Sequence, residues 1–366
     1  MPITAAVEGV RASVYEVPTD RPEADGTLAW DHTTVVVVEV DAGGETGLGW
    51  TYAGSGASSV VDGVLAPAVL GGEAIDVPRH HDSMARAVRN LGRPGIAASA
   101  ISAVDTALWD LRARLLGLSL ADALGRCRDD VAAYGSGGFT TYDDATTEAQ
   151  LREWVEGWGI PRVKIKIGES WGSDPERDLH RVALARRVVG DDVELFVDAN
   201  GAYTRKQAIR LGRRMCEDFG VTWFEEPVSS DDIPGLRQVR AACGADVAAG
   251  EYGYSLGYFK EMVTAVDCVQ VDVTRVGGPT AWLAVAHLAA ANGMDVSGHC
   301  APALHAHVGA AVPNCRHVEQ FHDHERIERL LFTGAPDPTA GRLRADPARP
   351  GHGMSLAPGA DGYRRS

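Results

Sequence analysis

The 366-residue chain has very little lysine. Lys and Arg together number 35, yet only four of these residues are lysine: Lys164, Lys166, Lys206 and Lys260. Positive charge therefore comes almost entirely from Arg, which keeps its proton in proteins, whereas lysine can lose one. Two of the four lysines share one strand-like segment, so we expect these two positions to need an amine that can titrate.

The sequence also lacks the signals of several protein classes. A net charge of −15 leaves too few spare cations for a nucleic-acid-binding face or an anionic-membrane partner. No run of about 18 apolar residues predicts a transmembrane helix, and no basic segment followed by a long apolar run predicts a secretory signal. The six cysteines form no CxxC or Cys/His zinc spacing. We therefore expect a soluble cytoplasmic protein with no nucleic-acid or membrane partner.

The first third of the chain has the pattern of a small α+β domain. Residues 10–17 alternate apolar and polar side chains, as in a strand, and residues 33–52 are typical of a β-hairpin. The Pro/Asp/Gly-rich stretch between them predicts a loop. Residues 58–125 have helical periodicity. Strands followed by helices predict a self-contained α+β domain over residues 1–126.

After residue 126 the sequence pattern changes to short β-like runs that alternate with helical segments. There are eight such runs: 131–137, 162–168, 193–200, 221–227, 246–252, 267–273, 294–299 and 316–321. Eight strands that alternate with helices at a regular period are the signature of a (β/α) barrel. We place this barrel at residues 127–334 and expect the Pro/Gly/Arg-rich segment 335–366 to pack back on the first domain.

Ionisable residues recur at the carboxyl ends of the predicted strands, where barrel enzymes build their active sites. Seven consecutive strands end in such residues: Lys164, Lys166, Asp198, Glu225, Glu251, Asp272, His299 and Glu319. A barrel whose strand ends served only packing would carry apolar or small side chains there. The sequence therefore predicts an active site at this end of the barrel.

Three of these residues, Asp198, Glu225 and Glu251, are carboxylates that follow one another at one barrel repeat each. Three converging carboxylates would repel one another unless one were protonated or a cation lay between them. All-oxygen ligation favours Mg²⁺ or Mn²⁺ over Zn²⁺. The alternative is that each carboxylate caps a helix or pairs with Arg. Glu225 has the inward strand parity, so we expect it rather than Glu226 to be the ligand.

Lys164 and Lys166 alternate with Val163, Ile165 and Ile167. Strand alternation sends the apolar side chains to the helix layer and both lysines into the barrel. Two amines in a low-dielectric interior each lower the pKa of the other, which suits a lysine base at neutral pH. The alternative is a surface pair whose amines reach the solvent.

Asp272 and His299 end neighbouring strands of the predicted barrel. A carboxylate bonded to one imidazole nitrogen fixes the tautomer and leaves the other nitrogen free for substrate. A lone His299 could equally be a structural histidine, but its position opposite the lysines favours a proton-transfer role. His305, His307, His322 and His324 follow in helical or loop positions, where we expect structural or supporting roles, with contact of His322 or His324 with the substrate as the alternative.

Seven short motifs together resemble the enolase superfamily, specifically its mandelate racemase subgroup. They are KIK (164–166), VDAN (197–200), FEEP (224–227), GEY (250–252), VDVTRVGG (271–278), SGH (297–299) and HVEQ (317–320). The resemblance covers most of the chain and implies an N-terminal capping domain on a modified (β/α)7β barrel. Muconate-cycloisomerase-like members carry a lysine at the end of the sixth strand, whereas Val273-Thr274-Arg275 has none. The His–Asp pair thus favours the mandelate racemase branch.

The resemblance also implies roles for the strand-end residues. Asp198, Glu225 and Glu251 would bind Mg²⁺, with Mn²⁺ as a possible substitute. Lys166 would be the base on one face of the substrate, and His299 with Asp272 the base or acid on the other. Lys164 would neutralise the substrate carboxylate and Glu319 would hydrogen-bond the enolate oxygen. Relatives are often homo-oligomers, so an oligomer is expected here too.

Substrate choice is expected to lie in two loops of the capping domain, 18–31 and 51–56, which should close over the barrel mouth. We expect five side chains to contact the substrate: Asp25, Trp30, Tyr52, Asn200 and His322. The sequence does not name the substrate beyond a small carboxylate.

The favoured function is dehydration of an acid sugar, by abstraction of the proton next to its carboxylate and loss of the β-hydroxyl. Most mandelate-racemase-like relatives are acid-sugar dehydratases, which favours this function by analogy. Racemisation or epimerisation of a 2-hydroxy acid is the alternative, because groups for both faces are present. A non-catalytic carboxylate-binding protein would not need opposed proton carriers, and a zinc hydrolase would not use only carboxylates as ligands.

Overall fold

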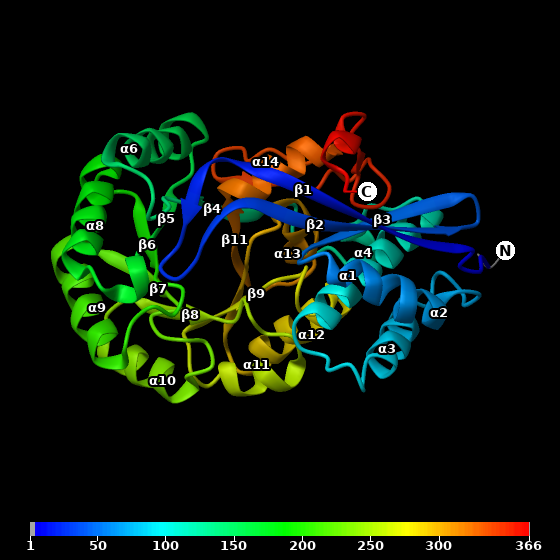
Figure 1. The fold of residues 1–366 in the computed structure, drawn as a ribbon, viewed down its shortest axis with the longest axis horizontal. Coiled ribbons are helices and arrows are strands. Elements are labelled where there is room, and N and C mark those ends of the chain that lie inside the picture. The colour runs from blue at the N-terminus through cyan, green and yellow to red at the C-terminus, as the bar shows by residue number, and fades with distance from the viewer. Residues whose placement is uncertain (1–3, 366) are drawn as a thin grey trace.

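The computed structural model describes residues 4–365 and contains two domains (Figure 1). The N-terminal sheet is antiparallel, in the order β1 (Gly9–Ala24), β2 (Ala29–Ala42) and β3 (Glu45–Tyr52). In the tight β2–β3 hairpin Ala42 pairs with Glu45, and Gly43 and Gly44 form the turn between them. The predicted α+β cap therefore has its strands first and its helices after them.

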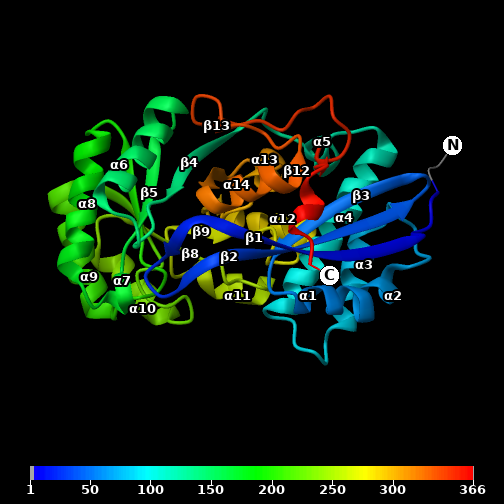
Figure 2. The same ribbon diagram turned by 45° about the horizontal axis from the view of Figure 1, so that its top comes forward.

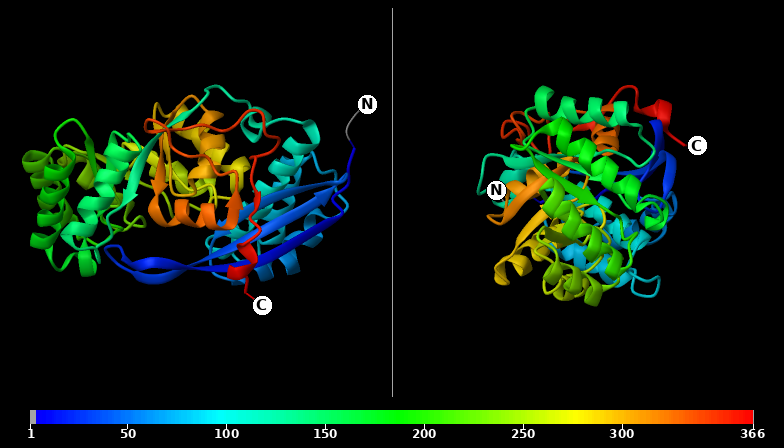
Figure 3. Two further views of the ribbon diagram at one scale, coloured as in Figure 1. Left: turned by 90° about the horizontal axis from the view of Figure 1, so that it is seen from above. Right: turned by 90° about the vertical axis from the view of Figure 1, so that its left-hand side faces the viewer.

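The stretch 18–31 is not a loop, which corrects the sequence-based expectation. β1 continues to Ala24 and β2 begins at Ala29, with Glu23 opposite Trp30. The register is irregular between Pro18 and Glu23, where the prolines are tolerated because β1 is an edge strand. The two strands form a long ribbon that runs from the cap towards the barrel (Figures 1 and 3).

The tip of this ribbon is a tight turn held by one carboxylate. Asp25 Oδ1 accepts hydrogen bonds from the backbone N–H groups of Thr27 (2.6 Å) and Leu28 (2.8 Å). An aspartate side chain that bonds the backbone two residues on is a common way to fix a turn. The other predicted loop, 51–56, runs from the end of β3 to the start of the first helix.

Five helices complete the cap: α1 (Gly56–Val60), α2 (Ala66–Val69), α3 (Val77–Ala87), α4 (Ile96–Leu116) and α5 (Leu120–Leu124), with a π-helical turn at Val61–Leu65. The long helix α4 packs directly on β3. A Cβ at Gly47 or Gly49 would collide with the carbonyl oxygens of Ala107 and Ala103. These two glycines therefore let the strand and the helix approach closely.

The predicted barrel is confirmed. Its eight parallel strands are β4 (Val131–Gly137), β5 (Arg162–Lys166), β6 (Glu194–Asp198), β7 (Val221–Glu225), β8 (Asp246–Ala249), β9 (Cys268–Val271), β10 (Asp295–Gly298) and β11 (Cys315–Phe321). Neighbours in sequence pair throughout, and β11 pairs with β4 to close the cylinder.

Helices follow the strands and cover the barrel from outside (Figure 2). They are α6 (Asp144–Arg152), α7 (Glu169–Gly172), α8 (Pro175–Val189), α9 (Arg205–Phe219), α10 (Ile233–Ala242), α11 (Leu256–Met262), α12 (Gly278–Ala291), α13 (Pro302–Ala310) and α14 (His322–Leu331), with a π-helical turn at Glu153–Gly157. No helix among residues 4–365 is both long and apolar enough to cross a membrane.

Aromatic rings fill the barrel interior below the strand ends. Tyr134, Phe196 and Trp223 are buried, and each has its ring centroid within 5.5 Å of the His317 ring. This filling gives the charged residues above it an apolar floor that excludes water. Charges on that floor interact more strongly than they would in water.

The C-terminal segment contacts both domains, so the expected packing on the cap is only part of its role. β13 (Arg342–Leu343) pairs with β4 of the barrel. β14 (Ser355–Leu356) pairs with β12 (Phe332–Thr333), which directly follows α14. The last 3-10 turn (Ala360–Tyr363) lies against β1 of the cap, where Arg365 N–H donates to Val14 O.

Helix α4 of the cap supplies the N-terminal cap of barrel helix α12. The Ser102 hydroxyl oxygen accepts from the N–H groups of Gly277 (2.8 Å) and Gly278 (3.1 Å). Asp105 accepts from the N–H of Thr280 at 3.0 Å. The first N–H groups of a helix have no partner within it, so these bonds both stabilise α12 and fix the position of the cap.

We expect Ser102→Ala to lower the free energy of unfolding by about 1–3 kcal/mol, because it leaves buried N–H groups without an acceptor. Denaturant unfolding of both proteins measures this difference. Ser83→Ala is the matched control: Ser83 also donates to the carbonyl four residues earlier, but in an exposed position. Equal losses in the two variants would show that the contact between the domains adds nothing.

Candidate active site

A cavity of about 340 Å³ lies between the cap and the carboxyl ends of the barrel strands. Cap residues Asp25, Trp30 and Tyr52 line it, as expected from the sequence. Asn200 and several strand-end residues line it from the barrel. The ribbon tip and the β3–α1 connection thus cover the mouth of the barrel, where the sequence placed its substrate-selecting segments.

Asp198, Glu225 and Glu251 converge at one side of this end of the barrel. Each offers a carboxylate oxygen, and these oxygens all lie within 4.8 Å of one another. All three residues are buried. The structure therefore brings together the three carboxylates that the sequence predicts as metal ligands, from three successive strands.

Several oxygens beside this cluster have no protein partner. Asn200 Oδ1 and Glu226 Oε1 are buried and accept no hydrogen bond, and Glu251 Oε2 accepts no aligned one although His299 Nε2 is 3.2 Å away. Buried polar atoms normally find partners, so unsatisfied ones suggest a missing ligand. The two glutamate oxygens are hard donors that fit a divalent cation such as Mg²⁺, whereas Asn200 lines the cavity, where its Oδ1 would face a bound molecule.

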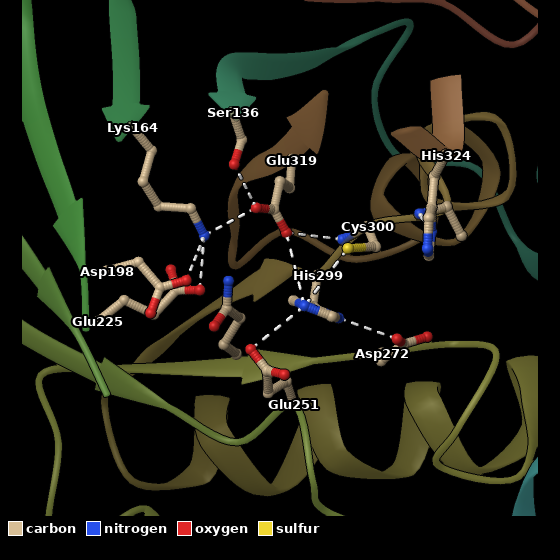
Figure 4. A network of polar contacts seen from close by, with 12 residues as sticks. Ser136, Lys164, Asp198, Glu225, Glu251, Asp272, His299, Cys300, Glu319 and His324 are labelled. Carbon is tan, nitrogen blue, oxygen red and sulfur yellow. Dashed lines mark hydrogen bonds and ion pairs between the residues drawn. The ribbon is translucent and has the colours of Figure 1, made fainter. Parts of the chain in front are cut away.

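Both lysines point into the barrel, as strand alternation predicts (Figure 4 shows Lys164). Lys164 Nζ lies 2.5 Å from Glu225 Oε1, 2.7 Å from Glu319 Oε1 and 3.6 Å from Asp198 Oδ2. Lys166 Nζ lies 2.5 Å from Asp198 Oδ2 and lines the cavity. Val163 and Ile165 are buried in the opposite direction, in the main hydrophobic core.

Lys164 lowers the pKa of Lys166, as expected, but this effect does not decide the net pKa of either lysine. Burial lowers the pKa of Lys166 and so does the charge of Lys164, but the carboxylates of Asp198, Glu319 and Glu251 together outweigh both and raise it. In the same way the carboxylates of Glu225 and Glu319 overcome burial and raise the pKa of Lys164 well above its usual value. The direction of both lysine pKa shifts is decided by carboxylates on other strands. The segment 162–168 contains none of the strand-end carboxylates, so its own sequence could not reveal this direction.

His299 and Asp272 form the expected pair. His299 Nδ1 lies 2.9 Å from Asp272 Oδ2, while Asp272 Oδ1 accepts from both the N–H and the hydroxyl of Thr274, each at 2.7 Å. The second carboxylate oxygen is therefore committed, which fixes the orientation of Asp272. Burial opposes the charged imidazole, but Cys300, Glu251 and the bond to Asp272 raise the pKa of His299 well above its usual value.

Glu319 lies between the lysine and histidine sides (Figure 4). Its Oε1 accepts from the Ser136 hydroxyl at 2.6 Å, and its Oε2 accepts from Cys300 N–H at 2.9 Å. Burial raises the pKa of Glu319, but Lys164 and His299 outweigh burial and lower it. The carboxylate is thus held in one orientation by groups from three strands or strand ends.

Ser136, Cys300 and Arg275 belong to this site but were not predicted for it. Ser136 shares the inward parity of Tyr134 on β4, a signal that strand alternation could have supplied. Arg275 Nη1 lies 3.2 Å from Glu251 Oε1, and its Nε lies 3.4 Å from Asp272 Oδ2. Cys300 has a positive φ of 53°, a strained conformation with no clear sequence signal.

The histidine expectation needs one correction. His322 does not line the cavity; it lies 3.3 Å from Asp20 on the cap ribbon. His324, two residues later, lines the cavity and stacks on Tyr52 with ring centroids 3.4 Å apart. His305 and His307 are buried and bonded to backbone carbonyl oxygens, in keeping with structural roles.

The arrangement places two titratable nitrogen groups at one cavity, the Lys166 amine and the His299 imidazole. Lys166 ends β5 and His299 follows β10, and the barrel order puts two strands between them on one side and four on the other. Both side chains line the cavity. A molecule bound between them would be within reach of an amine from one side and an imidazole from the other.

Family models match nearly the whole chain. Residues 10–125 match the mandelate racemase/muconate lactonizing enzyme N-terminal domain, and residues 146–360 match the enolase C-terminal domain-like model. A solved mandelate racemase/muconate lactonizing enzyme-like protein from Rubrobacter xylanophilus is 48% identical, with a TM-score of 0.95 over 98% of this chain and 100% of that one.

Two characterised relatives are more distant. The L-talarate/galactarate dehydratase of Salmonella typhimurium is 33% identical, covering 92% of this chain and 86% of its own length. Its structure with Mg and L-lyxarohydroxamate has a TM-score of 0.91 over 99% of this chain and 94% of that one. The 3,6-anhydro-alpha-L-galactonate cycloisomerase of Streptomyces coelicolor is also 33% identical, over 96% of this chain and 97% of its own length. This chain belongs to the mandelate racemase/muconate lactonizing enzyme family of the enolase superfamily.

Proposed function

We propose that the protein is a Mg²⁺-dependent enzyme that abstracts the α-proton of a carboxylate substrate and dehydrates an acid sugar. One observation carries the proposal: Lys166 and His299, which is bonded to Asp272, line one cavity from different sides, beside three converging carboxylates. A protein that only bound a carboxylate would need neither opposed proton carriers nor a buried carboxylate cluster.

Asp198, Glu225 and Glu251 would hold the Mg²⁺. The bound ion would supply positive charge beside the substrate carboxylate, where negative charge grows as the α-proton leaves. It would also offset the carboxylates that keep the pKa of Lys166 high, because the ion competes with the amine for Asp198. The structure of the Salmonella typhimurium dehydratase holds Mg, which supports the choice of this ion.

Lys164 and Glu319 stabilise the developing enediolate in this proposal. The Lys164 amine is completely buried, so its charge acts on the substrate with little screening by water. Glu319 is held by Ser136 and Cys300 N–H. Because Lys164 and His299 lower its pKa, it would hydrogen-bond an enolate oxygen only after it takes up a proton. Fixed groups of this kind need no reorganisation when the charge forms.

Lys166 is then positioned to take the α-proton. His299 is positioned to deliver a proton to the departing β-hydroxyl, with Asp272 holding its imidazole in place. The Salmonella relative is a dehydratase, which favours elimination. Epimerisation is the second candidate, because His299 could instead return a proton to the opposite face of the same carbon.

Incubation of an acid-sugar library with the enzyme and Mg²⁺ in D₂O distinguishes the two outcomes. We expect a 2-keto-3-deoxy acid product, observed by NMR, because loss of the β-hydroxyl follows removal of the α-proton. Recovery of inverted acid with deuterium at Cα would instead establish an epimerase. No exchange and no product with any acid would refute proton abstraction altogether.

The roles of the two proton carriers can be separated by substitution. Lys166→Ala should abolish both α-proton exchange and product formation. His299→Asn should retain exchange but slow elimination by about 10²-fold or more, since it removes only the acid. Lys206→Ala is the control, an exposed member of the four lysines. Exchange that survives in Lys166→Ala but not in His299→Asn would reverse the assignment.

If Glu251 binds the metal, Glu251→Gln should weaken Mg²⁺ binding by at least about tenfold. Mutation of residues that only hold a metal ligand in place already weakens binding by that factor. Isothermal titration calorimetry of the purified proteins measures the affinity. Glu261→Gln on the exposed side of α11 removes the same charge away from the site and should leave the affinity unchanged. Equal affinities in all three proteins would place the cation elsewhere.

A further inference from the structure

We propose that the substrate is a monocarboxylate with an uncharged, hydroxylated tail, as in an aldonate, and not a dicarboxylate such as an aldarate. This inference rests on the proposed function, because it assumes that the substrate carboxylate to be activated lies at the barrel end. It concerns the rest of the molecule, which must extend towards the cap.

The cations that line the cavity from the barrel side are already paired. Lys166 lies 2.5 Å from Asp198. The Arg275 guanidinium is shared between Glu251 (3.2 Å) and Asp272 (3.4 Å) and lies over the Tyr252 ring, 5.2 Å from its centroid. Withdrawing Arg275 to bind a substrate would take a cation away from two buried carboxylates, which is costly. It is therefore a poor receptor for a second substrate carboxylate.

The cap side of the cavity carries carboxylate and neutral groups. No Lys or Arg of the cap residues within the described range 4–365 lines the cavity. Asp25 at the ribbon tip does line it, and its carboxylate accepts hydrogen bonds from Thr27 and Leu28. His32 is the one cap histidine on this wall, and it lies 2.6 Å from Asp31 and 3.6 Å from Glu16. Asp323, from the barrel, adds a carboxylate that Arg326 balances.

Two barrel residues, His324 and Asn200, add neutral hydrogen-bonding groups to this part of the cavity wall. The Nδ1 of His324 accepts the N–H of Ala301 at 3.3 Å, so the ring proton belongs on Nε2. Burial lowers the pKa of His324 to about 3, which keeps the ring neutral. Its stacking on Tyr52 fixes the ring plane. His324 is therefore a neutral donor for a hydroxyl oxygen, and the unpartnered Asn200 Oδ1 is an acceptor for a hydroxyl proton.

A second carboxylate in this part of the cavity would meet Asp25 without an available cation. Like charges at short range repel, and a carboxylate that loses water without gaining a cation is costly. A hydroxyl group can instead donate to Asp25 or Asn200 and accept from His324. The wall thus matches a polyol chain in both the sign of its charge and its hydrogen-bonding capacity.

Matched pairs of acids test the proposal directly. D-gluconate and D-glucarate differ only in the terminal CH₂OH or carboxylate, and so do D-galactonate and galactarate. With the Mg²⁺-loaded enzyme, we expect kcat/KM for product formation or α-deuterium exchange to be at least about tenfold higher for the preferred aldonate than for its aldarate. Each reaction is followed by NMR in D₂O over the same range of concentrations.

Asp25→Asn then identifies the residue that sets the preference. Asn keeps an oxygen for the backbone bonds of the ribbon tip but removes the charge, so the aldonate-to-aldarate ratio should fall. Asp31→Asn on the same ribbon is the control: Asp31 does not line the cavity and its side chain is 90% exposed. Its ratio should remain that of the wild type.

The outcomes separate this inference from the proposed function. Faster turnover of aldarates would overturn the inference and leave the proposed function standing, as would an aldonate preference that Asp25→Asn does not change. Failure of every acid to exchange its α-proton would overturn the proposed function itself. An aldonate preference that weakens in Asp25→Asn but not in Asp31→Asn would support the inference.

Discussion

The structure depends on how one end of the barrel accommodates an excess of buried negative charge. Six carboxyl groups are buried within a few residues of the strand ends: Asp198, Glu225, Glu226, Glu251, Asp272 and Glu319. Against them stand Lys164, Lys166 and Arg275, each within 3.4 Å of at least one carboxylate. Burial and the neighbouring carboxylates of Glu251 and Asp198 raise the pKa of Glu226 well above its usual value. A divalent cation would neutralise part of this excess negative charge. The same ion would therefore stabilise the folded site and take part in the proposed reaction.

The two domains divide the work. In the proposed function the barrel supplies the groups that move protons and stabilise charge, because its strand ends bring residues far apart in sequence to one place. The cap supplies the ribbon tip and the β3–α1 connection that cover the cavity. Ser102 and Asp105 fix the cap to the first turn of α12, directly after the β9 segment that carries Asp272 and Arg275. These hydrogen bonds thus hold the cap, with its ribbon tip and β3–α1 connection, in a fixed position over the carboxyl end of the barrel strands.

The barrel and the candidate site were predictable because their signals are local and periodic. Strand alternation placed Lys164 and Lys166 inward, and one-repeat spacing brought Asp198, Glu225 and Glu251 together. Other features depend on contacts that no local pattern shows. The ribbon 18–31 has the composition of a loop, and its strand character comes from pairing with β2. The lysine pKa values depend on carboxylates from other strands, and the choice between His322 and His324 depends on side-chain directions at the start of α14.

The central claim is that the excess buried charge forms a cation site. A crystal structure of the wild-type enzyme with Mn²⁺, with an anomalous difference map at a wavelength where Mn²⁺ scatters, tests it most directly. We expect one strong peak bounded by Asp198, Glu225 and Glu251, with the Lys166 amine moved away from Asp198. A map with no peak there, and with Lys166 still bound to Asp198, would contradict it.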